Sequence, residues 1–335
     1  MKFLIPPLSL LLLTACVGVL PEPEADLNTF GVDSLPDEYS QRTFDQFSAS
    51  DWLGSFKSAD LNFLVEKAIK SNRTLAQEAA AVRLAEQNVR LSDSTLWPNL
   101  GLSLSTQRGD TGMGSATQSG LSLTAGYEVD LWGRLNAVQQ QSQIDLARQK
   151  ASYREAERTL VRDVVNAGFD ASSATQLLGL LNQRFTNLTE SLDVIERGYR
   201  SGLNDALDVY LSRNTLELER AGIANQQQIH FESLTRLELL LGDYPAAKLA
   251  VSANLQSLHL DPIAAGIPAN LLSRRSDIQQ AWLELLSADA GVAIAHRNRF
   301  PALNLSGSLS DSSQELDELL DGGSLMWRVA ASLIQ

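Results

Sequence analysis

The feature that most constrains the fold is a long proline-free run that begins directly after a short alternating segment. In residues 126–132, Tyr127, Val129 and Leu131 alternate with polar residues, as in a β-strand. From 133 to about 199 the alternation stops, and the chain is rich in Ala, Gln, Leu and Arg without a proline. A helix of about 65 residues is roughly 100 Å long, far beyond an ordinary globular helix. The sequence therefore predicts a strand that passes directly into a very long helix.

A short turn divides the helical run into two parts. Gly198 and Gly202 permit tight-turn geometry, and Asn204 or Asp205 is suited to cap the helix that follows. Because two long helices joined by a short turn return antiparallel, we expect a helical hairpin over residues 133–242.

An internal repeat organises the rest of the chain. Residues 71–105 align with residues 274–308 at an offset of 203, which pairs Pro98 with Pro301. In both copies a helical apolar pattern leads to an aromatic residue, a proline and an alternating strand, in that order. We therefore expect two units that are built alike.

The repeat sets the expected segment boundaries. The helix of the first repeat is expected at 59–96 and the first β-hairpin at 99–131, with a Gly- and Ser-rich loop at 106–118. An irregular region is expected at 243–272. The helix of the second repeat follows at 273–299 and the second hairpin at 301–335. By symmetry a second long helix pair should follow Gln335, so we expect the sequence to be truncated at its C-terminus.

The N-terminus has the pattern of an export signal. Residues 1–15 hold a lysine and a short apolar core, as in a signal peptide, and Leu13-Thr14-Ala15-Cys16 resembles a bacterial lipobox. We expect cleavage before Cys16, lipidation of its thiol and an extended lipid-anchored segment over 16–58, with no other cofactor. The alternative is an ordinary signal peptide with an incidental cysteine. Val17 favours the outer membrane as the destination.

Three segments resemble the TolC-like outer membrane factor family, in its lipoprotein branch that serves tripartite RND-type efflux pumps. They are YEVDLWGRL (127–135), YRSGLNDALDVYLSRNTLELER (199–220) and the stretch from GIPANLLSRRSD onward (266–310). One departure is Ser276, where the family commonly has proline. The resemblance implies a mainly α fold with β, in which long antiparallel helical hairpins form an α-barrel. Two β-hairpins per chain contribute to a trimeric transmembrane β-barrel.

The resemblance also implies a function. The homotrimer would be a passive exit duct in the outer membrane for small molecules such as drugs, docked to a periplasmic adaptor protein and an inner-membrane pump. Gly202 and Leu203 match the element that contacts the adaptor in this family; the alternative is an ordinary helix turn. Other readings are the outer-membrane component of type I protein secretion, a non-conducting lipid-anchored scaffold, and a truncated chain that does not assemble.

The hairpins fit this implied membrane location. Each has one apolar and one polar face, and its unpaired edges must close with other copies before it enters lipid. The apolar faces would then meet lipid and the polar faces water. Trp97, Trp132 and Phe300 fall at strand–helix junctions, so we expect them to form an aromatic belt at the membrane interface, against the alternative of simple packing.

Composition and motifs argue against other classes. The net charge of −13 disfavours a nucleic-acid partner, which needs clustered Lys and Arg. His230, His259 and His296 are scattered, and no phosphate-binding, dinucleotide-binding or hydrolase motif is present. The chain has three methionines and no Met or His cluster. We therefore expect neither an enzyme nor a metal site.

Overall fold

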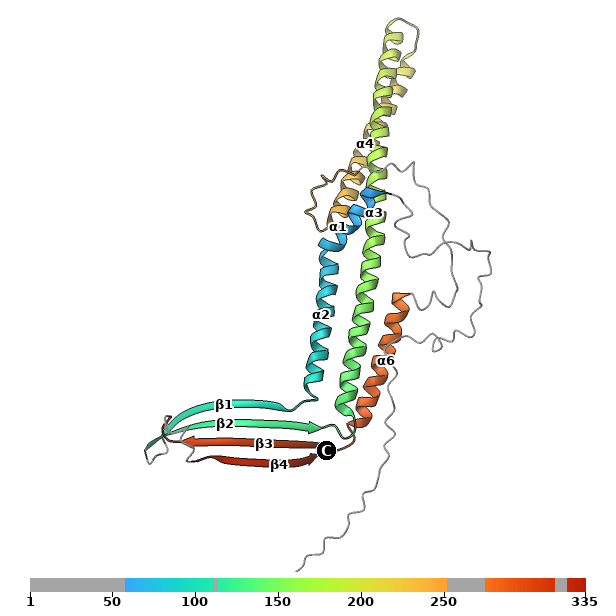
Figure 1. The fold of residues 1–335 in the computed structure, drawn as a ribbon. Helices are drawn as coiled ribbons and strands as arrows, with labels where there is room; N and C mark the ends of the chain where they lie inside the picture. Colours follow the sequence, from blue (N-terminus) through green and yellow to red (C-terminus); the bar gives the residue numbers. More distant parts are fainter. Residues whose placement is uncertain (1–57, 111, 113, 252–274, 317–323) are drawn as a thin grey trace, which may run out of the picture. The chain divides into compact units, whose positions relative to one another are not determined.

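The computed structural model describes residues 58–110, 112, 114–251, 275–316 and 324–335 (Figure 1). The signal peptide, Cys16 and most of the irregular region 243–272 lie outside these residues. The described elements are, in order, α1 (Ala59–Ser71), α2 (Arg73–Ser94), β1 (Asn99–Asp110), β2 (Ser115–Val129), α3 (Arg134–Arg200), α4 (Ala206–Leu240), α6 (Ser276–Arg297), β3 (Ala302–Ser313) and β4 (Met326–Ile334). The predicted combination of long helices with a small antiparallel sheet is confirmed.

The chain divides into two compact units. The described part of the first holds residues 82–150 and 278–335, which include the whole sheet. That of the second holds residues 58–81, 151–251 and 275–277, which include all of α4 and the turn before it. Helices α2 and α3 contribute residues to both units. Among the described residues, no helix combines the length and apolar composition needed to cross a membrane.

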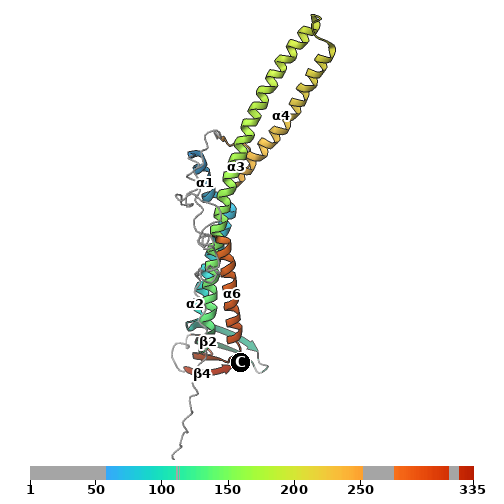
Figure 2. The same ribbon diagram turned by 90° about the vertical axis from the view of Figure 1, so that its right-hand side faces the viewer.

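The proline-free run forms α3, a single helix of 67 residues. It is followed by α4, of 35 residues, whose N-cap Asp205 forms a capping box with Asp208. Figure 2 shows the end of α3 and the whole of α4 side by side and antiparallel. Polar contacts join them: Arg213 of α4 donates to Glu196 of α3 at 2.7 Å, and Gln226 donates to the carbonyl of Ala174 at 3.3 Å.

The repeat is confirmed at residue resolution. Helices α2 and α6 both have 22 residues, and strands β1 and β3 both have 12. Their first residues, Arg73 with Ser276 and Asn99 with Ala302, differ by the same offset of 203 (276 − 73 and 302 − 99). Ser276, the departure from the family proline, is thus the first residue of α6. Proline is favoured at this position because the N–H there needs no helical partner.

The first helix differs from expectation. One helix was predicted over 59–96, but Asn72 divides it, with ψ of 127° in the extended region. The Asn72 side chain accepts the Leu75 N–H at 2.9 Å and donates to the carbonyl of Leu240 at 2.9 Å. It therefore caps α2 and ties the break to the end of α4. The helical spacing of apolar residues continues through Asn72, so this pattern did not predict the break.

All four strands form one antiparallel sheet in the order β1-β2-β3-β4. The two predicted hairpins are joined through β2 and β3, which pair from Ser119↔Ser313 to Val129↔Leu303. The predicted loop 106–118 is shorter than expected, because β1 continues to Asp110 and β2 begins at Ser115. Polar residues such as Thr106 and Ser119 bond across the strands at 3.0 Å, so a polar composition did not mark a loop here.

The main apolar core lies in the second unit. Side chains from α1, α3 and α4 meet there, with Val65, Ala68, Val164, Ala171, Leu237 and Leu241 among the buried members. Small residues let the helices approach: a Cβ on Gly168 of α3 would lie 3.6 Å from the Leu61 side chain of α1. Gly242, just after α4, has φ of 74°, and a Cβ there would overlap the carbonyl of Ser71. This position therefore requires glycine.

Candidate functional site

The sheet has two chemically distinct faces. Cross-strand rows on one face are apolar, for example Leu102, Leu123, Leu309 and Trp327. Rows on the other are small and polar, for example Ser103, Ser122 and Ser310. Leu102 and Trp327 are 74% and 77% exposed, so no described residue of the chain covers the apolar face at these edge strands. Such a sheet requires an apolar environment on one side and water on the other.

The apolar face has a defined extent. Along β2 it runs from Leu121 to Val129, a rise of roughly 26 Å at 3.3 Å per residue. Beyond Leu121, toward the β1–β2 turn, the same face becomes polar. Thr106 and Ser119 bond to each other there, and Arg108 donates to Ser115 at 3.3 Å.

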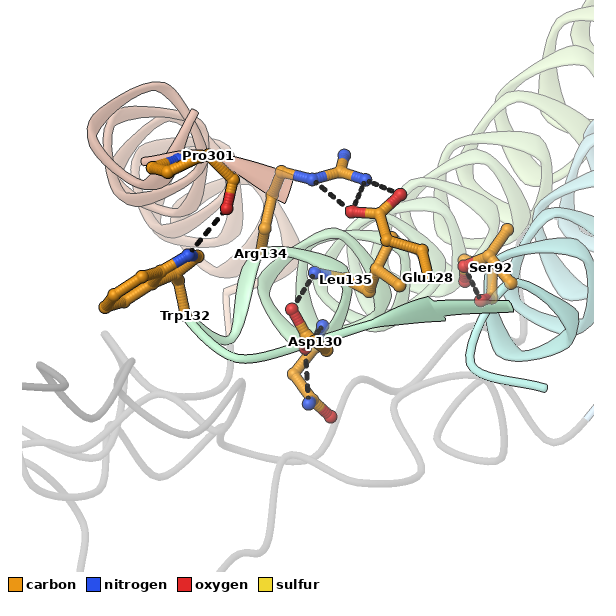
Figure 3. Close-up of polar contacts among 9 residues, drawn as sticks. Ser92, Glu128, Asp130, Trp132, Arg134, Leu135 and Pro301 are labelled. Carbon is orange, nitrogen blue, oxygen red and sulfur yellow. Dashed lines mark hydrogen bonds and ion pairs between the residues drawn. The ribbon is translucent and has the colours of Figure 1, made fainter. Parts of the chain in front are cut away.

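The sheet joins α3 through a closely bonded turn (Figure 3). Asp130 caps the helix: its carboxylate accepts the backbone N–H of Leu135 at 3.0 Å and that of Asn136 at 2.9 Å. Gly133 has φ of 72°, the left-handed conformation that a chain needs to change direction here. Its carbonyl accepts a bond from Arg297 of α6 at 2.7 Å. These contacts explain how a strand ends and a helix begins within four residues.

An ion pair spans this turn. Arg134, the first residue of α3, donates to both carboxylate oxygens of Glu128 on β2, at 2.6 and 2.8 Å. Glu128 lies on the polar face, in the row of Asn304 and Ser332. The pair therefore neutralises a carboxylate where the polar face meets the helices. Neither this pair nor the Asp130 cap was predicted, because Asp130 lies four residues before α3 and not at the N-cap position that a sequence signal marks.

The three junction aromatics are not equivalent. The rings of Trp132 and Phe300 stack with centroids 4.9 Å apart. The Trp132 indole N–H donates to the carbonyl of Pro301 at 2.9 Å (Figure 3). Trp97 is 74% exposed. The three junctions therefore differ in packing: Trp132 and Phe300 pack on each other across the repeat, and Trp97 does not join them. A role at the membrane interface stays a prediction for all three.

The turn between α3 and α4 presents Gly202 and Leu203 at its surface. Gly202 has φ of 78°, and the N–H of Leu203 bonds back to the carbonyl of Gly198 at 2.8 Å, closing the end of α3. Leu203 is 82% exposed. The hydrogen bond to Gly198 fixes the backbone of Leu203, while its side chain extends into solvent. Leu203 is therefore a preformed apolar contact point on the surface of the turn.

More exposed apolar side chains continue from this turn along α4. They are Leu207, Tyr210 and Leu211. Glu196 and Arg213 join the helices beneath them, and the hydrogen bond and charge of Glu196 raise the pKa of Arg213 above its usual value. We call Leu203, Leu207, Tyr210 and Leu211 the tip patch. An exposed apolar set on a braced turn is typical of a surface that binds another protein.

In the part of the chain that the structure describes, no group of three or more His, Cys, Asp or Glu side chains is arranged to hold a metal ion. The candidate sites are therefore surfaces: the two-faced sheet, its junction with α3, and the tip patch.

Comparison with known proteins matches these features to one family. The family model described as outer membrane efflux protein matches residues 64–243 and 267–335. The chain is 27% identical over 286 residues to the cation efflux system protein CusC of Escherichia coli O6:H1, covering 84% of this chain. It is 30% identical over 288 residues to the solvent efflux pump outer membrane protein SrpC of Pseudomonas putida, covering 83% of this chain.

The solved structures agree on the fold. The Campylobacter jejuni CmeC outer membrane channel superposes with a TM-score of 0.79 at 22% identity, covering 89% of this chain and 66% of CmeC. The chain spans 62% of the length of CusC and 61% of that of SrpC.

Proposed function

This chain belongs to the outer membrane efflux protein family, and we propose that it forms the outer-membrane exit duct of a tripartite efflux pump. Three copies assemble, each giving its four-stranded sheet to one closed barrel of twelve strands (3 × 4) and its long helices to a periplasmic α-barrel. The duct is passive. An inner-membrane pump supplies the energy, and small molecules leave through the barrel.

The observation that carries this proposal is the two-faced sheet with free edges. An apolar run of roughly 26 Å, inclined at about 40°, spans about 20 Å, most of the apolar band of outer-membrane barrels, which is about 25 Å tall. Strands β1 and β4 have no further partner in the described chain, and such edges are tolerated in lipid only after closure. Closure places the apolar face toward lipid and the Ser- and Thr-rich face around water.

The repeat predicts the register in which two copies meet. Within the chain, Gly126 of β2 pairs with Ser306 of β3, which joins the first repeat to the second. The hairpin pairs Asn99↔Gly126 and Ala302↔Ile334 make Ile334 the equivalent of Gly126. Ser103 is the equivalent of Ser306, at the offset of 203. Ile334 of one copy therefore faces Ser103 of the next, and two residues along, Ser332 faces Ser105.

The tip patch supports the second half of the proposal, docking to a periplasmic adaptor. It lies at the turn between α3 and α4, the part of the hairpin that lies farthest along α3 from its junction with the sheet. Gly202 holds the turn, and Leu203 is the apolar contact that an adaptor would cover. Small-molecule export is proposed for this chain on the basis of its family, since CusC and SrpC are named for cations and solvents respectively.

The lipid anchor completes the proposed localisation. Lipidated Cys16 would hold the N-terminus in the outer membrane while the helices extend into the periplasm. Labelling with a palmitate analogue tests this: the wild-type chain incorporates label, and a Cys16→Ser variant does not. Equal labelling of both would contradict the anchor.

The test of the duct itself is electrical. The chain, extracted from outer-membrane fractions in mild detergent, is added to planar lipid bilayers. The proposal predicts oligomers that dissociate on heating and uniform conductance steps in the bilayer. A monomer that gives no steps would contradict the duct and favour the scaffold reading.

A further inference from the structure

Arg328 lies on the polar face of the sheet, near the start of β4. It pairs with Ser308 of β3, and the row continues through Thr124 and Gly101. The rows on either side of it carry no charged side chain. The residues beside its guanidinium side chain on this face are therefore neutral, and all but Met326 are small.

The charge balance of this face is unusual for the chain. Among the described strand residues, one other charged side chain lies on the polar face, that of Glu128, and Arg134 is bonded to it at 2.6 Å. Arg328 has no ion-pair partner among the described residues. The described strand residues of the polar face thus carry one uncompensated positive charge per chain, whereas the whole chain has a net charge of −13.

Arg328 lies at the level of the apolar run on the opposite face of the sheet, so the polar face must be in contact with water there. Its neighbours along β4, Trp327 and Val329, lie on the apolar face and are 77% and 75% exposed. They align with Leu309 and Gly307, inside the apolar run. An arginine at this depth is tolerated on the lumen side of a barrel and strongly disfavoured on the lipid side.

We infer that Arg328 sets the ionic preference of the duct, by giving its barrel a ring of positive charge that favours anions. The inference rests on the proposed function, because three copies are needed to form the ring. Rings of charged side chains select ions by sign, and low-dielectric walls strengthen their field. For three charges roughly 10 Å from an aqueous axis, Coulomb's law with screening between 0.1 M salt and none raises the anion concentration about two- to eightfold and lowers the cation concentration by the same factor. The preference of anion over cation is therefore about five- to seventyfold.

The test measures the chloride-to-potassium permeability ratio of the full chain in bilayers under a potassium chloride gradient. The wild-type channel is expected to prefer chloride. Arg328→Gln should lower the ratio by about five- to seventyfold, and Arg328→Lys should keep it. Arg108→Gln is the matched control, since it removes the same charge from β1 on the opposite face, and it should leave the ratio unchanged.

A second variant keeps the test independent of folding. Arg328→Cys channels are treated in the bilayer with a cationic or an anionic thiosulfonate reagent, so one folded channel is measured in two charge states. The cationic reagent should restore chloride preference and the anionic one should reverse it. If the permeability ratio is the same with either reagent at residue 328, the inference about Arg328 is overturned while the proposed duct stands. A wild-type chain that forms no channels would overturn the proposed function and the inference with it.

Discussion

The guanidinium of Arg134 donates hydrogen bonds to both carboxylate oxygens of Glu128, at 2.6 and 2.8 Å, across the turn between β2 and α3. The two residues are six positions apart, and the turn between them contains Asp130, Trp132 and Gly133. Each of these three makes a contact of its own, to the start of α3, to Pro301 and to Arg297. The direction in which the helix leaves the sheet is thus held by several polar bonds at once.

Breaking the pair should loosen this turn. Glu128→Gln removes the charge but retains shape, and both side chains are about two-thirds buried or more. We expect a loss of about 1 kcal/mol in the free energy of unfolding, at the upper end for exposed pairs because the geometry is bidentate. Thermal unfolding followed by circular dichroism measures it. Asp163→Asn, which breaks the adjacent-residue pair with Arg162 on the exposed side of α3, should change stability less.

Leu203 should affect docking without affecting folding. At 82% exposure its replacement by aspartate removes an apolar contact that only a partner uses, so the melting temperature should stay within about 1 °C of wild type. Export of a dye from cells that carry the adaptor and pump should fall several-fold. Leu218→Asp, also exposed on α4 but away from the turn, is the control. Equal loss of export in both variants would contradict a specific docking turn.

Replacement of Gly202, unlike replacement of Leu203, should lower the stability of the helical hairpin. Open space surrounds its Cα, so alanine meets no steric obstacle, but its φ of 78° strains any residue with a Cβ. We expect Gly202→Ala to cost about 1 kcal/mol of stability in the hairpin. Gly222, in the middle of α4 and also surrounded by open space, is the matched control. There alanine should stabilise by about 1 kcal/mol, because the backbone is helical.

Much of the fold follows from local patterns, and the exceptions share a cause. The long helices and alternating strands are visible because apolar residues recur at periods of 3.6 and 2 along one segment. The break at Asn72 and the stack of Trp132 on Phe300 depend instead on partners more than 160 residues away, Leu240 and the second repeat. The tip residues Gly202 and Leu203 were found through family resemblance. Arg328 was missed because a single arginine in the sequence does not indicate a site. Its significance appears only when the strand register shows which face of the sheet it occupies and which residues lie beside it.

Glu238 gives the second unit a pH dependence that was also not foreseen. Burial raises the pKa of this carboxyl, but the backbone N–H groups of Lys248, Ala247 and Leu249 bond to the carboxylate and lower its pKa by more. Its pKa is therefore below the usual 4.5. A carboxyl whose folded pKa is lowered stabilises the fold above its unfolded pKa, and this stabilisation is lost as pH falls through the folded pKa.

Glu238→Gln should accordingly destabilise at neutral pH, by about 2 kcal/mol, the worth of hydrogen bonds to a charged group. The difference from wild type should shrink as the pH falls from about 5 toward 2. Unfolding by urea at a series of pH values measures this, and Glu232→Gln, an exposed change one turn and a half earlier on α4, is the control. A constant difference between Glu238→Gln and wild type at every pH would exclude the proposed role of the charge.

The most direct test of the account is the predicted contact between copies. Ser332→Cys and Ser105→Cys in one chain place a thiol on each free edge, facing each other across two copies about 5 Å apart. A short bifunctional thiol reagent should link every copy to the next and give a covalent trimer on denaturing gels. Ser332→Cys with Leu104→Cys, one residue along and on the opposite face, should give little. No linkage with Ser105→Cys, or equal linkage with Leu104→Cys, would contradict closure of the sheets into one barrel in this register.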